Sequence, residues 1–177
     1  MAIVIIIVAV LVVIVGALLL IAASKPDTFQ VQRSARIKAG PDRIFGMIND
    51  FHNWGSWSPW EKLDAAMKKT HSGPPSGTGA VYEWEGNKQV GQGRMEIMES
   101  VPPSRVHIKL DFIKPFQAHN TADFTFVPDG DGTNVTWTMH GQMPFMFKVM
   151  STFFSMDKMI GKDFEAGLAN LKGITEK

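Results

Sequence analysis

The side chain best suited to carry out chemistry is Asp157, which falls within or beside the apolar stripe of an amphipathic segment. Apolar residues recur at helical spacing over residues 151–171, which predicts one long helix near the end of the chain. An unpaired charge on the buried face of a helix costs several kcal/mol. In a cavity, Asp157 would have a raised pKa and would hydrogen-bond a polar ligand group or serve as a general acid or base.

Two structural roles for Asp157 stand beside the chemical one. Arg33 is the one cation in the apolar phase of an early strand, so it is the candidate partner of Asp157 in a buried ion pair. Alternatively, Asp157 lies near the true start of the helix, where a carboxylate interacts favourably with the helix dipole. The sequence leaves these three roles open. Gly161, one turn later, is predicted to let the helix approach a sheet closely.

A second group of candidates consists of residues in the inward phase of predicted strands. Asn120 lies among Ala and Phe, where it would contact a ligand or satisfy backbone groups near a strand end. The rings of Tyr82, Trp84 and Trp137 carry polar tips; core packing is favoured for them, and pocket lining does not conflict with it. The set predicted to face a ligand comprises Tyr82, Trp84, Met95, Ile108, Leu110, Asn120, Phe124, Trp137, Asp157, Ile160 and Phe164.

Three tryptophans, Trp54, Trp57 and Trp60, stand within seven residues. Gly55 and Pro59 interrupt this run, so a regular helix is not expected there. Each indole carries an N–H that needs a partner when it is buried. We interpret the segment as an aromatic plug that closes one end of the core, or as a lip at a ligand entrance or at a membrane interface.

The sequence gives no motif for a metal or a cofactor. It has no cysteine, and none of its five histidines has a metal-ligand spacing such as HExxH. Asp129–Gly132 lacks the distal Glu of a calcium loop, and Gly91–Gly93 has no helix after it to bind a dinucleotide. With 18 basic and 17 acidic residues and no basic patch, the chain is not expected to bind nucleic acid. We therefore predict no metal site, no cofactor and no nucleic-acid partner.

The first long segment, residues 2–23, has no charged or polar side chain. As a helix it would be about 33 Å long, enough to cross the ~30 Å hydrocarbon core of a bilayer. A cleaved signal peptide is the alternative, but no Lys or Arg precedes the run and the run is long for one. We predict a transmembrane anchor over residues 1–24 and a folded domain over 25–177. The basic residues that follow, Lys25 first among them, favour the cytoplasmic side for this domain.

The elements that would position the candidate residues are mostly strands. Alternation of apolar and polar residues predicts about seven strands, and a short helix begins near Gly40 after the first. After a charged patch at 61–69 the strands form an antiparallel meander, and the final helix supplies the only other large apolar face to cover it. The predicted strands span residues 28–38, 67–72, 79–85, 90–100, 105–112, 117–127 and 133–141.

Several motifs resemble one known family. They are Ala39-Gly-Pro-Asp-Arg-Ile-Phe45, Trp54-x-x-Trp57-Ser-Pro-Trp60, Val90-Gly-Gln-Gly-Arg-Met95, Gly132-Thr-x-Val-Thr-Trp137 and the segment 156–172. Together they resemble bacterial polyketide cyclase/dehydrase-like proteins of the START-like SRPBCC superfamily, over the whole part that follows the apolar run. The resemblance implies an α+β helix-grip fold, in which a curved antiparallel sheet grips a long C-terminal helix around a hydrophobic cavity.

The resemblance does not fix the function, because this superfamily includes lipid carriers, hormone and polyketide binders, and cyclases. The favoured hypothesis is a single-pass membrane protein whose domain binds a hydrophobic small molecule or lipid, since its interior is rich in Met and Phe. One alternative is a cyclase- or dehydrase-type enzyme that uses a cavity carboxylate, with Asp157 as the candidate catalytic residue. The other is an interaction or stress-response module that binds no ligand. The sequence indicates no protein partner.

Overall fold

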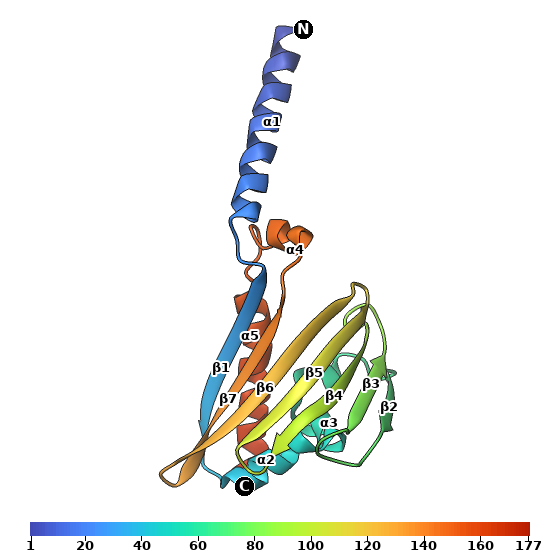
Figure 1. The fold of residues 1–177 in the computed structure, drawn as a ribbon, viewed down its shortest axis with the longest axis vertical. Coiled ribbons are helices and arrows are strands. Elements are labelled where there is room, and N and C mark those ends of the chain that lie inside the picture. Colours follow the sequence, from blue (N-terminus) through green and yellow to red (C-terminus); the bar gives the residue numbers. More distant parts are fainter.

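The strands of the protein form one curved antiparallel sheet that wraps around the last helix (Figure 1). The computed structural model describes residues 1–177. The sheet has seven strands in the order β1-β7-β6-β5-β4-β3-β2, so the predicted α+β helix-grip fold is confirmed. The strands are β1 (Thr28–Ile37), β2 (Lys68–Ser72), β3 (Val81–Glu85), β4 (Gln92–Val101), β5 (Arg105–Lys114), β6 (Ala118–Asp129) and β7 (Gly132–Gln142).

The helices lie at the start and end of the chain and in the connection between β1 and β2. They are α1 (Ala2–Ala23), α2 (Pro41–Asn49), the single turn α3 (Trp54–Trp57), α4 (Phe145–Met150) and α5 (Met156–Thr175). Two 3₁₀ turns, Phe51–Asn53 and Pro59–Lys62, flank α3. The tryptophan segment is thus a series of short turns, because Gly55 and Pro59 prevent a longer helix.

Alternation along the strands decides which side chains reach the interior. In β5, Val106, Ile108 and Leu110 are buried, whereas the residues between them are more exposed. The pairing of β6 with β7 sets Phe124 opposite Trp137. Strands β2 to β7 are neighbours in sequence order, whereas β1 pairs with β7 along its full length. The first and last strands of the chain therefore lie side by side.

The helix α5 packs against the inner face of the sheet through its apolar stripe. Phe164 is fully buried, and its ring stacks on that of Trp137 at 3.9 Å between centroids. Burial of one such side chain contributes about 2–3 kcal/mol. Gly161 and Gly167 lie where the helix comes closest: a Cβ at 167 would lie 2.9 Å from the Trp137 ring, and one at 161 would overlap the Arg33 guanidinium.

The helix α5 begins at Met156, so the prediction that it starts at residue 151 is wrong. The hydroxyl of Ser155 accepts a hydrogen bond from the Lys158 amide at 3.3 Å and caps the helix. Residues 151–155 form a linker that turns the chain away from α4. Phe153, which belongs to the range 151–171 predicted to be helical, lies in this linker and is 64% exposed.

The helix α1 projects from one end of the domain, and α4 lies beside its base (Figure 1). The most apolar stretch of 18 residues in α1 has a mean hydropathy of 3.7, and none of it is buried against the rest of the protein. Its length and composition suit either a membrane anchor or a signal sequence.

Candidate functional site

A cavity of about 490 Å³ lies between the sheet and the first turns of α5. Its volume falls within the ~300–1,000 Å³ range of small-molecule sites. The walls come from β3 to β7, the floor includes part of the tryptophan segment, and Met156 and Ile160 of α5 cover one side. Most of the lining is apolar, and it includes Trp54, Trp60, Tyr82, Trp84, Met95, Leu110, Phe112, Ala122, Trp137 and Met139.

Two buried polar atoms of the cavity lining have no hydrogen-bond partner within the protein. They are the Asn120 side-chain oxygen, Oδ1, and the Trp137 indole nitrogen, Nε1. By contrast, the indole nitrogens of Trp54, Trp57 and Trp84 donate to backbone carbonyls at 3.0, 3.1 and 3.0 Å. A buried polar group without a partner costs about 1–3 kcal/mol. Both atoms belong to residues of the cavity lining, although each atom is itself buried.

A buried carboxylate, Glu61, forms part of the cavity wall. Its side chain is 7% exposed; it accepts a hydrogen bond from the Tyr82 hydroxyl at 2.6 Å and pairs with Lys69. Burial, together with the hydrogen bond to Glu61, raises the pKa of Tyr82 well above its usual range. Tyr82 therefore remains protonated and donates to Glu61. Stacking of the His71 ring on Tyr82 closes this corner from outside.

The cavity extends to the end of the sheet from which α1 projects, and we call this end its mouth. β1 starts at this end, β7 ends there, and the turn between β5 and β6 lies beside them. Residues of these strand ends line the cavity, among them Phe29, Phe116 and Met143, together with Phe147 of α4. The lining also includes Trp54, Trp60 and Trp137.

Asp157 lies outside the cavity, on the surface of α5. Its carboxylate pairs with both terminal nitrogens of Arg33, at 2.9 and 3.0 Å, and Glu165 accepts from Arg33 Nε at 2.7 Å. The Asp157 side chain is 56% exposed, so the ion pair lies at the surface and is not buried as predicted. Hydrogen bonding from Arg33 lowers the pKa of Asp157, which is the reverse of the raised pKa that a cavity acid needs. This geometry gives Asp157 no route to a ligand in the cavity.

The other predicted ligand-facing residues divide between the cavity and the solid core. Tyr82, Trp84, Met95, Leu110, Asn120, Trp137 and Ile160 line the cavity. Ile108, Phe124 and Phe164 are fully buried in the core but lie outside the lining. The tryptophan segment divides in the same way, since Trp54 and Trp60 line the cavity whereas Trp57 is a fully buried core residue.

Sequence reasoning missed several lining residues. Glu61 belongs to the charged patch at 61–69, which looks like a solvated loop in sequence, and only the fold turns its side chain inward. Asp163 was overlooked on α5. Ala122 and Met139 share the inward phase of Asn120 and Trp137 in their strands, and both line the cavity. The inward phase was a usable signal for these two residues, whereas no sequence signal marked Glu61.

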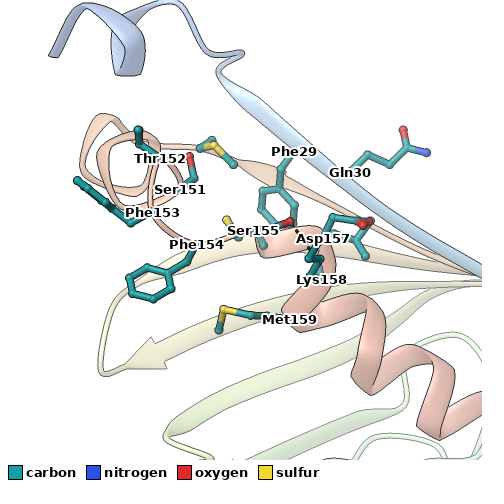
Figure 2. A pocket seen from close by; sticks show the side chains of 13 residues that line it. Phe29, Gln30, Ser151, Thr152, Phe153, Phe154, Ser155, Asp157, Lys158 and Met159 are labelled. Atoms are coloured by element: carbon teal, nitrogen blue, oxygen red, sulfur yellow. Dashed lines mark hydrogen bonds between the residues drawn. The ribbon is translucent and has the colours of Figure 1, made fainter. Parts of the chain in front are cut away.

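A second, more open hollow of about 740 Å³ lies at the surface between the start of β1 and the 151–155 linker. Figure 2 shows its lining, with Asp157 and Lys158 at the start of α5 near Phe29 of β1. Phe29, Met143 and Met156 line both hollows, so the surface hollow and the cavity adjoin at these three side chains.

Comparison with protein families identifies the domain. The family model described as "Polyketide cyclase / dehydrase and lipid transport" matches residues 28–176. The chain belongs to this family. The resemblance seen in the sequence motifs is therefore confirmed. No curated protein sequence matches the chain.

Solved structures share the fold of this polyketide cyclase/dehydrase family member at low sequence identity. The di-domain ARO/CYC proteins StfQ, of the steffimycin pathway, and BexL, of the BE-7585A pathway, match with TM-scores of 0.64 and 0.63 at 11% and 13% identity. The matches cover 84% and 89% of this chain and 51% and 53% of theirs, about half of each di-domain protein. A protein from Chromobacterium violaceum matches with a TM-score of 0.59 at 15% identity, over 86% of this chain and 99% of its own.

Proposed function

We propose that this domain binds a hydrophobic small molecule, a lipid or isoprenoid-like amphiphile, in the cavity between the sheet and α5, and that α1 anchors it in a membrane. The observation that carries the proposal is the apolar cavity of about 490 Å³ with two unpaired buried polar atoms. Apolar burial at about 25 cal/mol per Å² holds a hydrocarbon chain without catalytic groups. A polar head on the same molecule would satisfy Asn120 near the mouth.

The ligand's own polarity follows from the two unpaired atoms. A plain hydrocarbon would leave both Asn120 Oδ1 and Trp137 Nε1 without hydrogen-bond partners, so the free-energy cost of burying each unpaired atom would remain. An oxygenated amphiphile offers an acceptor to the indole N–H and a donor to the amide oxygen. Because discrimination by a site that hydrogen-bonds its ligand is strong, these two positions set the preference.

Photo-crosslinking in vesicles tests this function. The full chain is reconstituted into phosphatidylcholine and phosphatidylglycerol vesicles that contain a diazirine analogue of palmitic acid, irradiated and mapped by peptide mass spectrometry. We expect adducts on cavity residues such as Met95, Leu110 and Trp137, in addition to adducts on α1. The α1 adducts serve as an internal control for reconstitution. Adducts confined to α1 would contradict ligand binding in the cavity.

Sidedness forms part of the proposal. Lys25 follows α1 directly, and the next basic residues are Arg33, Arg36 and Lys38, so the positive-inside rule favours the cytoplasmic side for the domain. Protease treatment of right-side-out spheroplasts tests this placement. We expect the domain to be protected until the membrane is permeabilised, and digestion of intact spheroplasts would reverse the assignment.

An enzyme of cyclase or dehydrase type is the second candidate function, and two carboxylates in the lining favour it. Glu61 and Asp163 both line the cavity, and Glu61 lies within hydrogen-bond reach of Tyr82. A dehydrase would remove water from a β-hydroxyacyl thioester probe. Loss of one water in the presence of the full chain, abolished by Glu61→Gln, would support this function, and an unchanged probe would count against it.

A further inference from the structure

The exposed apolar side chains of the domain are concentrated at one end. Apart from Met1 and α1, twelve large apolar side chains are exposed, and half of them come from residues 145–159. We name six of these twelve the apolar collar: Phe116, Phe145, Met146, Met150, Phe153 and Phe154. Phe153 and Phe154 are each 64% exposed, and a clustered set of this kind marks an interaction surface.

The collar is assembled from two segments that lie far apart in the sequence. Phe116 belongs to the turn between β5 and β6, and its ring meets that of Phe147 in α4 edge to face at 6.1 Å. Both segments lie at the end of the domain that faces α1 (Figure 1). Figure 2 shows Phe153 and Phe154 projecting to the same side, away from Gln30 of β1.

Polar contacts fix the collar to the base of α1. Lys148 of α4 is buried, and its ammonium donates to the Asp27 carboxylate at 2.6 Å and to the Lys25 carbonyl at 2.9 Å. Lys25 donates in return to Ser151 at 2.9 Å and to Thr152 at 3.1 Å. The connection between α1 and β1 is short, and these bonds hold it, so α4 cannot move far from the end of α1.

We infer that the apolar collar is immersed in the interfacial layer of a lipid bilayer, so that the mouth of the cavity opens onto lipid. The collar adjoins that mouth, because Phe116 of the collar and Phe147, which contacts it, also line the cavity. The surface hollow adjoins the cavity at the same end, where Phe29, Met143 and Met156 line both. Entry of a ligand from the bilayer rests on the function proposed above, whereas insertion of the collar does not.

The bilayer is the occupant that fits this surface, because α1 lies directly beside it. α1 is fully apolar and has the length of a membrane span, and α4 lies against its last turns. Phe and Met side chains on a short helix and its linker insert into the headgroup boundary of a bilayer. Lys25 lies between the span and the collar, at the level of anionic headgroups.

Depth-dependent fluorescence quenching tests the insertion. The chain has no cysteine, so the variants Met146→Cys and Phe153→Cys each carry a single bimane label in the full-length protein. Val127→Cys is the matched control, because Val127 is 57% exposed and lies near the opposite end of the sheet. The proteins are reconstituted into phosphatidylcholine and phosphatidylglycerol vesicles with or without a doxyl-labelled phosphatidylcholine.

We expect labels at 146 and 153 to lose most of their fluorescence to the doxyl lipid, and the label at 127 to lose none. Labels at 146 and 153 that behave like the control would overturn the insertion. A blue-shifted emission without quenching by the doxyl lipid would also overturn it, because the collar would then contact protein. Quenching at the collar without crosslinks in the cavity would support insertion and refute ligand binding. Crosslinks in the cavity without quenching at the collar would support ligand binding and refute insertion.

Discussion

Substitution of Ala122 by Phe would fill part of the cavity from its sheet side. Ala122 lies in β6 between Ile108 of β5 and Met139 of β7, and its small side chain leaves space that belongs to the cavity. The new ring would point inward from a well-ordered central strand. Because the ring enters existing space, we expect the stability of the variant to stay within about 1 kcal/mol of the wild type.

The expected loss of affinity follows from the volume that the ligand no longer occupies. A phenyl ring adds about six carbon atoms, and each buried methylene contributes about 0.8 kcal/mol, so exclusion of an equal length of chain costs up to about 5 kcal/mol. If the ligand shifts toward the mouth and recovers half of this, about 2.5 kcal/mol remains, which weakens binding roughly fiftyfold or more.

The photo-crosslinking assay reads this loss directly. Ala122→Phe should lose the adducts on β4 to β7 and keep those on α1, in the same sample. Ala169→Phe adds the same ring at an exposed position of α5 and should crosslink like the wild type. If Ala122→Phe retains wild-type adducts on the cavity walls and a wild-type near-ultraviolet circular dichroism spectrum, the cavity is not the binding site.

Three further outcomes are expected. Asn120→Leu removes an unpaired buried oxygen, so thermal unfolding should show a gain of about 1 kcal/mol while crosslinking of an oxygenated probe falls; a loss of stability would show that the amide has a structural role. Phe164→Ala should cost about 3–5 kcal/mol in urea unfolding because it removes the ring stacked on the central indole, and the exposed Phe153→Ala should cost little; equal costs would contradict this packing. Hydrogen bonding from Lys148 lowers the pKa of Asp27, and a depressed carboxyl pKa contributes stability that is present above the unfolded value of about 3.9 and is lost as the pH falls through the lower folded value. Amide exchange in α4, corrected for intrinsic rates, should therefore rise only below about pH 4, and Asp27→Asn should raise it at pH 7; a rise by pH 6 in the wild type would refute this link.

The candidate site could be predicted only in part, and Asp157 and Glu61 show why. Asp157 lies at the edge of the apolar stripe in sequence, but in the fold its carboxylate pairs with Arg33 and is 56% exposed. Glu61 lies in a charged patch, and only the fold of the following turns brings it against Tyr82. Helical periodicity predicts the direction of a side chain around the helix axis only to within about the angle between neighbouring residues. That precision does not distinguish a side chain in a cavity from one on the adjacent surface.

Residue patterns alone determined the elements and their order. The period-two alternation of β1 and of β4 to β7 predicted which side chains face inward, because successive strand residues point to opposite faces of a sheet. The apolar run of α1 and the apolar stripe of α5 also predicted helices, because apolar side chains are favourable only when they are buried or in contact with lipid. These patterns also predicted that α5 would cover the sheet.

The tertiary structure decided which inward positions face empty space. Phe164 and Gly167 of α5 lie in close contact with Trp137, so that part of the interior is solid. Nearer its start, Met156 and Ile160 face the cavity instead. The separation between the helix and the curved sheet varies along its length, and no local pattern encodes that separation. The three-dimensional fold thus made Leu110 a cavity residue and its strand neighbour Ile108 a core residue, although both have the same phase and the same apolar character.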